Sequence, residues 1–263
     1  MDILAILAAG LSFPSYRSNV VPEAGRPVAS MVWDSFSEGL YEIGADGKDF
    51  FIYDNEKPKH KTYLQDFSIA DRLIRNGAYL RFIEDGGYQN PKLWLSKGWD
   101  WVQKNDVRTP LYWLQQADVW FQYSLLGLHE MELSHPVSHL SYFEADAFAR
   151  WYGARLPTEA ELECSLYQDE ERSVEPRVMA TDCYDLKNSL WCWTQSHYSP
   201  YPGFKSFEGL VSEYNGKFMC GQFVLRGGCF ATPRGHNRDT YRNFYEPDQR
   251  WMFSGLRLAK DTQ

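Results

Sequence analysis

The stretch that decides the fold runs from Pro136 to Glu163 and reads PVSHLSYFEADAFARWYGARLPTEAELE. In it, Ser141 is followed three residues later by Glu144, a pairing in which the two side chains satisfy free amide groups at the start of a helix. Apolar residues then recur at helical spacing until Gly153, and glycine commonly ends helices. These signals predict a helix over residues 141–151.

The same stretch contains the start of a second helix, over residues 158–167. Thr158 and Glu161 repeat the capping pair, and Pro157 precedes the cap. Toward the N-terminus, apolar residues at helical spacing predict a further helix over residues 71–85, which two glycines would end. Two or three short helices are therefore expected.

Strand signals are short and scattered. Residues 36–53 have apolar runs broken by glycines, consistent with a hairpin, and residues 223–226 and 255–260 read as strands around an irregular loop. The segment 88–137 is rich in Trp and Tyr but shows few clear elements, and 170–217 is mostly loop. We therefore predict an α+β fold with little regular secondary structure and long aromatic loops, which are often functional.

The composition limits the classes of function. Aromatic residues make up 16% of the 263 residues, enough to line a pocket for a cationic ligand as well as to fill a core. The formal net charge is -8 and no basic run occurs, which argues against nucleic-acid binding. The sequence has no apolar run of about 18 residues, so no transmembrane helix and no membrane partner are expected.

Cysteine usage and the N-terminus bear on the cellular compartment. The five cysteines are odd in number and contain no CxxC pair, which favours free thiols in a reducing cytoplasm. The alternative is a secreted disulfide framework. Residues 1–31 read as an apolar stub followed by a linker, and Asp2 stands where a signal peptide would carry positive charge. We therefore predict a cytoplasmic protein.

Three segments carry a resemblance to a known superfamily. They are the stretch 136–163, VLRGGCFATP at 224–233 and GLRLAKD at 255–261. All three resemble the formylglycine-generating-enzyme-like (sulfatase-modifying factor) domain, a variant of the C-type-lectin fold. The resemblance implies that residues 32–263 form one such domain of α+β class, preceded by the stub and linker.

Further segments narrow the resemblance. They are YDNEKPKH (53–60), EDGGYQNPKLWLSKGWDWV (84–102), PLYW (110–113), YPGF (201–204) and TYRNFYEPDQRWMFSGLRLA (240–259). These look like the C-terminal domain of the sulfoxide synthases of ergothioneine biosynthesis, the hercynylcysteine sulfoxide synthase family. Enzymes of that family use non-haem iron and oxygen to join a cysteine thiol to the imidazole of trimethylhistidine.

The resemblance implies a substrate pocket around the loop after residue 240. Its implied substrate-binding residues are Asn243, Phe244, Tyr245, Arg242, Gln249, Arg250 and Tyr214. Asn243 is suited to bind the betaine carboxylate, whereas Phe244 and Tyr245 offer aromatic faces to a trimethylammonium group, which cannot donate hydrogen bonds. Tyr245 and Gln249 look more like the subgroup that uses free cysteine than the one that uses γ-glutamyl-cysteine. No catalytic residue is assigned to this chain.

Each of these assignments has a structural alternative. Arg242 and Arg250 are also suited to buried ion pairs that hold the loop, Phe244 to the core, and Tyr214 to the surface. Separately, Asp-Asn-Glu at 54–56 offers oxygen ligands for a structural calcium ion. The alternative there is a turn held by side-chain hydrogen bonds.

The resemblance also implies iron(II), but this sequence offers no ligands for it. In the family, three histidines on an N-terminal DinB-type four-helix domain with an HxxxHxE motif hold the iron, and residues 1–31 contain nothing like it. His135 and His139 have HxxxH spacing, but Pro136 follows the first and favours extended chain, so no metal site is predicted. The implied partner is a separate DinB-type iron-binding chain.

A formylglycine-generating activity is not expected. That chemistry needs two redox cysteines after the glycine pair, and Thr232 and Asn237 stand at the matching positions, with Cys229 alone nearby. The sequence predicts the substrate-binding half of a non-haem iron sulfoxide synthase, an oxygen-dependent oxidoreductase acting on trimethylhistidine and cysteine or γ-glutamyl-cysteine. The alternatives are a non-catalytic lectin-like module that binds a small betaine or amino acid, and a scaffold that has lost ligand binding.

Overall fold

The computed structural model describes residues 30–47, 51–168, 187–209, 214–233 and 236–262. Almost all of the predicted stub and linker, 1–31, lies outside these residues. The described chain is a mixed α/β fold in which short strands form several small sheets. None of the described helices has the length and apolar character that crossing a bilayer requires.

The N-terminal strands form two antiparallel ladders in separate sheets. They are β1 (Trp33–Phe36), paired with β4 (Phe67–Ala70), and β2 (Gly39–Ile43), paired with β3 (His60–Leu64). The hairpin predicted over residues 36–53 is therefore wrong. After β2 the chain passes Gly44, whose φ is 82°, and runs through the 3-10 helix η1 (Asp54–Glu56) before β3 returns. A short apolar run indicates a strand, but tertiary contacts choose its partner.

The second sheet runs in the order β10-β9-β8-β11. Its strands are β8 (Trp191–His197), β9 (Phe223–Arg226), β10 (Asn243–Tyr245) and β11 (Ser254–Gly255). The strand predicted at 223–226 is confirmed. The one predicted at 255–260 is divided between β11 and β12 (Ala259–Asp261), which pairs with β4. β8 lies in a segment that was predicted to be loop. Its signal was missed because its first four residues are all buried, so they show no polar–apolar alternation.

Both predicted capping boxes are formed. α4 (Tyr142–Trp151) begins where Ser141 Oγ accepts from the Glu144 N–H at 3.2 Å and Glu144 Oε2 accepts from the Ser141 N–H at 2.9 Å. α5 (Glu159–Gln168) begins with the same exchange between Thr158 and Glu161, at 3.1 and 2.7 Å. The two helices predicted from the deciding stretch are confirmed.

The third predicted helix is shorter than expected. α2 (Asn76–Glu84) starts at Asn76 rather than Asp71, because the residues before it bond to other segments. The Ile74 N–H, for example, donates to the Leu256 carbonyl at 3.1 Å. Gly86, with a φ of 78°, lies just after the helix, as predicted.

Several elements occur where few were expected. They are η2 (Gly87–Gln89), η3 (Pro91–Leu93), α3 (Ser96–Asn105), the antiparallel strands β5 (Trp113–Gln116), β6 (Val119–Ser124) and β7 (Gly127–Glu130), and the single turn α6 (Tyr214–Lys217). α3 escapes prediction because its N-cap residue is Leu95, which makes no side-chain cap. Without a polar cap, the usual start signal of a helix is missing.

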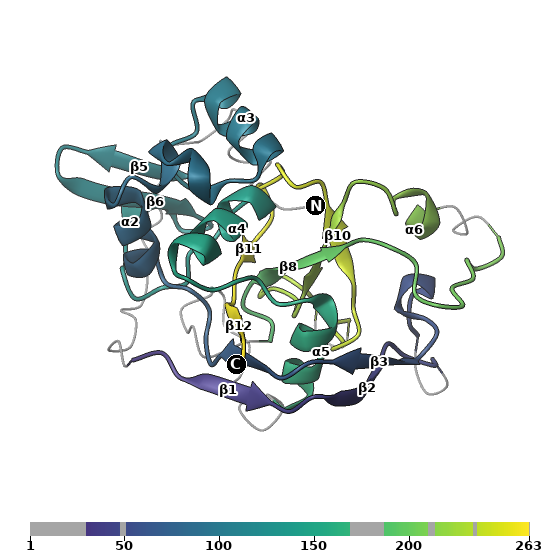
Figure 1. Cartoon of the computed structure of the whole chain (residues 1–263). Coiled ribbons are helices and arrows are strands. Elements are labelled where there is room, and N and C mark those ends of the chain that lie inside the picture. The colour runs from purple at the N-terminus through teal and green to yellow at the C-terminus, as the bar shows by residue number, and fades with distance from the viewer. Residues whose placement is uncertain (1–29, 48–50, 169–186, 210–213, 234–235, 263) are drawn as a thin grey trace.

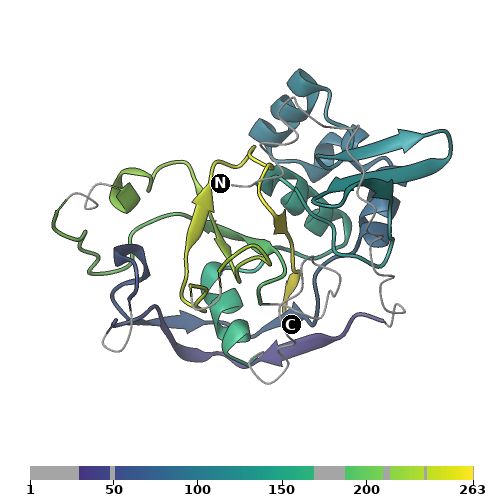
Figure 2. The ribbon, with the colours of Figure 1, turned by 180° about the vertical axis from the view of Figure 1, so that it is seen from behind.

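α5 packs between the N-terminal strands and the second sheet, so it joins the two halves of the core. Figures 1 and 2 show α2, α3 and the β5–β7 sheet gathered at one end of the molecule. At the opposite end, α6 lies beside η1. This second end brings together the residues described next.

Candidate functional site

A pocket of about 320 Å³ lies where η1, α6 and β10 meet. It is lined by Tyr53, Asn55, Tyr214, Asn215, Tyr241, Arg242, Asn243, Phe244 and Tyr245. The lining contains five of the seven residues predicted to bind substrate: Tyr214, Arg242, Asn243, Phe244 and Tyr245. Sequence reasoning missed the other four as pocket residues, although three of them, Tyr53, Asn55 and Tyr241, belong to segments that carried the resemblance.

The edge position of β10 explains why its side chains reach the pocket. β10 pairs on one side with β9, with Phe244 opposite Val224, and β9 is buried throughout. The residues of β10 are only half-buried because the strand has no neighbour on its other side in the described sheet. Because β10 is an edge strand beside the buried β9, Asn243 and its neighbours are partly accessible at the edge of the sheet.

The backbone conformation and close packing after β9 explain why glycine occupies positions 227 and 228. Gly227 and Gly228 both have positive φ, at 96° and 76°, and a Cβ atom on Gly228 would overlap the Asn237 side chain. The Asn237 amide donates to the Gly227 carbonyl at 3.0 Å and also contacts Asn188. Asn237, at a position where formylglycine chemistry would need cysteine, thus holds the turn.

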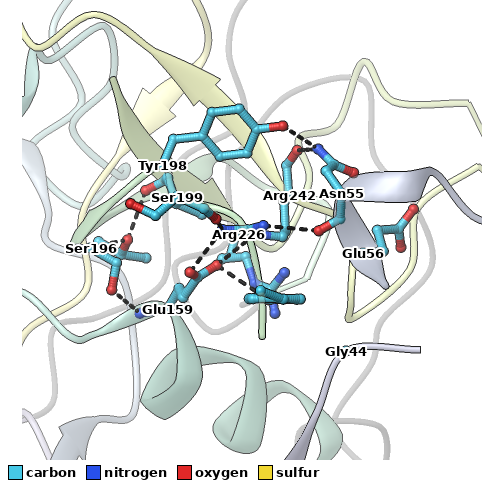
Figure 3. A network of polar contacts seen from close by, with 12 residues as sticks. Gly44, Asn55, Glu56, Glu159, Ser196, Tyr198, Ser199, Arg226 and Arg242 are labelled. Atoms are coloured by element: carbon cyan, nitrogen blue, oxygen red, sulfur yellow. Dashed lines mark hydrogen bonds and ion pairs between the residues drawn. The ribbon is translucent and has the colours of Figure 1, made fainter. Parts of the chain in front are cut away.

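Arg242 lines the pocket, and its guanidinium is held by protein acceptors. Its Nε and Nη2 donate to the two carboxylate oxygens of Glu159 at 2.9 and 3.0 Å. Nη1 donates to the Asn55 carbonyl and Nη2 to the Ser199 carbonyl, both at 2.9 Å (Figure 3). The guanidinium also stacks over the Tyr201 ring, 4.0 Å from its centroid. The Arg242 side chain therefore ties η1, α5 and β10 together, as the ion-pair alternative predicted.

The electrostatics of this buried cluster keep Arg242 charged. Burial acts to lower the pKa of Arg242, but the Glu159 carboxylate and nearby tyrosine hydroxyls raise the pKa above its ordinary value. Arg226, which pairs with Glu163 one turn further along α5, is fully buried, and burial lowers the pKa of Arg226 to about 10. Both arginines remain cations at neutral pH, and each pairs with a glutamate of α5.

The acidic residues of η1 bind protein donors. Asp54 accepts from the Phe207 N–H at 3.2 Å and from the Asn215 amide. Glu56 accepts from Arg238 at 2.6 and 3.1 Å and from the Thr240 hydroxyl at 2.6 Å. These contacts favour the alternative of a hydrogen-bonded turn over the structural calcium ion, although the partners come from distant rather than local residues.

The pocket wall combines one amide with several rings. Asn243 Oδ1 accepts from the Phe244 N–H at 3.0 Å, so the Asn243 NH₂ is the group that can face a ligand. Phe244 stacks on Tyr198 with centroids 4.0 Å apart and planes at 9°, and Tyr214, which is 62% exposed, lies above it. Tyr245 meets Trp251 edge to face at 5.1 Å. Phe244 is thus a half-buried pocket residue that stacks on the buried Tyr198 and is not part of the hydrophobic core of the described residues.

The remaining two predicted binding residues lie outside the pocket lining. Arg250 Nη1 donates to the Thr109 carbonyl at 2.9 Å and to Glu144 at 3.1 Å. The Gln249 N–H donates to the Glu246 carbonyl at 3.1 Å, within the turn after β10. The structure therefore joins Arg250 to α4 and leaves Gln249 in a turn, whereas the other five predicted residues meet at the pocket.

The histidine pair is buried and not helical. His135 and His139 lie in the connection between β7 and α4, and His139 has a φ of 61°, which no helix contains. Burial lowers the pKa of His139 to about 3. In the part of the chain that the structure describes, no three His, Cys, Asp or Glu side chains gather as a metal site. The described residues thus do not fit the iron that the resemblance implies.

Known proteins resemble this chain in sequence. The sequence pattern of the Sulfatase-modifying factor enzyme 1-like domain matches residues 17–174 and 170–262. A Mycobacterium tuberculosis protein named hercynine oxygenase is 31% identical over 240 residues, covering 79% of this chain and 56% of that protein. A Schizosaccharomyces pombe protein named ergothioneine biosynthesis protein 1 is 33% identical over 234 residues, covering 81% of this chain and 28% of that protein.

The chain spans about half to two thirds of the length of the bacterial relatives, between 56% and 65%. Among solved structures, variable protein 1 of Treponema denticola superposes with a TM-score of 0.53 at 14% identity, covering 88% of this chain and 95% of that one. A likeness at this identity is one of fold. It agrees with the mixed α/β architecture in Figures 1 and 2.

Proposed function

Because this chain belongs to the family of the Sulfatase-modifying factor enzyme 1-like domain, we propose that it acts in ergothioneine biosynthesis as the substrate-binding half of a non-haem iron sulfoxide synthase. The relatives named hercynine oxygenase and ergothioneine biosynthesis protein 1 support the pathway. Hercynine is the trimethylated betaine of histidine. We infer that this betaine occupies the pocket between η1, α6 and β10.

The observation that carries the proposal is the pairing of one amide donor with a wall of aromatic rings. Asn243 lines the pocket, and because its oxygen accepts from the Phe244 N–H, its NH₂ is the group that can donate to a ligand. A carboxylate only accepts hydrogen bonds, so it suits that donor. A trimethylammonium group donates none, so it suits the faces of Phe244, Tyr214 and Tyr245. A betaine carries both groups.

The proposal divides the reaction between this chain and a second component. The iron(II) would be held by a DinB-type domain or chain, which supplies the oxygen chemistry. The residues of this chain bind and orient the betaine, and the buried Arg242–Glu159 pair holds the pocket floor in place. Tyr245 and Gln249 are uncharged, which favours free cysteine over γ-glutamyl-cysteine as the thiol substrate.

Calorimetric titration of the full chain with trimethylhistidine tests the betaine site. We expect binding that is stronger than for histidine, which lacks the methyl groups. Asn243→Ala should weaken it at least about tenfold, because a hydrogen bond to a charged group contributes about 1.5–3 kcal/mol. Gln116→Ala, which removes an exposed amide on β5, should have no effect. Equal affinities for histidine and trimethylhistidine, or no binding at millimolar ligand, would contradict the proposal.

The second candidate is a betaine-binding module without catalysis. It is favoured by the contrast between a formed pocket and a described chain that gathers no metal ligands. Mixing the chain with an iron-loaded DinB-type protein and the two substrates separates the candidates. Sulfoxide formation and oxygen uptake that require both proteins support the synthase, whereas binding without turnover supports the module.

A further inference from the structure

One of the residues that line the pocket has a buried polar atom that the protein itself does not satisfy. Asn55 is 2% exposed and lines the pocket. Its side-chain NH₂ donates to the Tyr198 hydroxyl at 2.9 Å and to the Arg242 carbonyl at 3.3 Å. Its side-chain oxygen, Oδ1, has no hydrogen-bond donor among the residues that the structure describes. Figure 3 shows this oxygen turned away from Tyr198.

The orientation of the Asn55 amide is determined by its neighbours. The Arg242 main-chain carbonyl can only accept a hydrogen bond, so the Asn55 nitrogen must face it. Reversing the amide would place two oxygens against each other and leave the nitrogen without that acceptor. The unsatisfied atom is therefore an acceptor, and it is Oδ1.

Asn55 is also held firmly in place. Its main-chain carbonyl accepts from Arg242 Nη1 at 2.9 Å, so Asn55 and Arg242 bind each other twice. The residues on either side, Asp54 and Glu56, are bound to distant parts of the chain. A buried acceptor without a donor is costly, and native proteins contain few of them. An unsatisfied acceptor on a well-bonded residue that lines a pocket suits a ligand that brings the donor.

We propose that Asn55 Oδ1 accepts a hydrogen bond from an N–H group of the bound substrate. This inference rests on the proposed function and extends it to a residue that sets the orientation of the ligand. The carboxylate and the trimethylammonium group of a betaine have no N–H, so neither can satisfy Asn55. Asn243 marks the carboxylate end of the ligand, and Asn55 marks the end that carries a donor.

Two substrate groups have the required chemistry. One is the imidazole N–H of trimethylhistidine, and the other is the ammonium group of cysteine. A hydrogen bond from the imidazole would fix the rotation of the ring whose carbon is to receive the sulfur. A hydrogen bond from the ammonium would instead place the thiol substrate beside the betaine.

Paired ligands on the intact chain test this inference by calorimetry. The first pair is trimethylhistidine and the betaine of thiazolylalanine, in which sulfur replaces the ring N–H. The second pair, measured with the betaine saturating, is cysteine and 3-mercaptopropionate, which lacks the ammonium group. In one of the two pairs, we expect the ligand with the N–H group to bind at least about tenfold more tightly than the ligand without it. That pair identifies which substrate donates the hydrogen bond to Asn55.

Variants then assign the preference to Asn55. In Asn55→Ala the affinity ratio of the discriminated pair should fall to about one. If thermal unfolding shows that the Asn55→Ala variant is unfolded, Asn55→Leu is used in its place, because leucine is closer to asparagine in volume than alanine is. Tyr198→Phe is the matched control, since it removes a partner of the same amide but keeps Oδ1. There the ratio should be retained.

The outcomes separate this inference from the proposed function. If trimethylhistidine binds but neither pair is discriminated by the wild-type chain, the inference is wrong and the proposed function stands. The same holds if the ratio persists in Asn55→Ala or Asn55→Leu. If trimethylhistidine does not bind at all, the proposed function fails and the inference fails with it.

Discussion

At the scale of the residue, Arg242 shows how a side chain that lines a pocket can also hold it together by binding other parts of the protein. Its motif predicted either a substrate contact or a buried ion pair. The structure places its guanidinium against Glu159 and two main-chain carbonyls, with 2% of the residue exposed. Asn243, the next residue, also lines the pocket. Arg242 therefore fixes the backbone from which Asn243 extends.

Removing the partner of Arg242 should destabilise the protein. Glu159→Ala leaves a buried guanidinium without its carboxylate, and breaking a buried pair in this way costs about 3–5 kcal/mol. We expect that decrease in the free energy of unfolding, measured by urea denaturation. Glu208→Ala removes an exposed carboxylate and should change the free energy by less than about 0.5 kcal/mol. A loss of similar size in both variants would show that the pair is not essential to the fold.

At the scale of the element, α5 connects the deciding stretch to the pocket. Glu159 and Glu163 are four residues apart, so both lie on the same side of the helix. There Glu159 binds Arg242, which directly precedes β10, and Glu163 binds Arg226, the last residue of β9. The capping pair Thr158 and Glu161 determines where α5 begins. The start of the helix thus sets the position of the pocket floor.

The caps themselves should contribute measurable stability. Ser141→Ala removes the oxygen that accepts from the Glu144 N–H at the start of α4, and loss of such a cap costs about 1 kcal/mol. We expect a decrease of about that size in the free energy of unfolding by chemical denaturation. Ser96→Ala is the matched control, because Ser96 is exposed at the start of α3, a helix without a side-chain cap. A smaller loss for Ser141→Ala than for the control would contradict the role of the cap.

At the scale of the whole molecule, the pocket depends on segments that are far apart in the chain. η1, α6 and β10 span residues 54 to 245. His139 occupies a similar junction elsewhere: its carbonyl accepts from Leu111, and its ring contacts Tyr112 and Phe253. Such junctions close only when the entire domain is folded, so their properties report on global stability.

The burial of His139 predicts an acid-sensitive fold. Its pKa falls from 6.5 to about 3 on folding because burial disfavours the charged ring. The unfolded chain therefore binds a proton below about pH 6.5 that the folded chain does not. Stability should be complete above that pH and decrease by about 1.4 kcal/mol per pH unit toward pH 3 from this residue alone.

Chemical denaturation between pH 6.5 and 4.5 measures this slope. His139→Asn removes the titrating ring, and asparagine tolerates the φ of 61° at this position. The variant should lose stability less steeply with falling pH than the wild-type chain, by about one proton. Equal slopes in the two proteins would show that His139 does not titrate on unfolding.

The sequence alone determined the local elements and the family. Capping boxes and helical spacing act within a few residues, so α4 and α5 were predicted where they occur. The glycine pair and the strand at 223–226 were equally local. The resemblance placed four residues of the pocket, Arg242 to Tyr245, because they lie in one motif that can be read directly, whereas the fifth predicted residue, Tyr214, lies outside the quoted motifs.

Only the tertiary structure decided which strands pair and which side chains bind each other. The ladder between β2 and β3, the division of the last strand between two sheets, and the contact of Asn55 with Arg242 all join residues distant in sequence. No local pattern records such contacts, because burial and hydrogen-bond satisfaction depend on the whole chain. The sequence therefore predicted Asn55 to be a calcium ligand or a turn residue. Only its contacts with Arg242 and Tyr198 in the folded chain reveal that its buried oxygen lacks a donor.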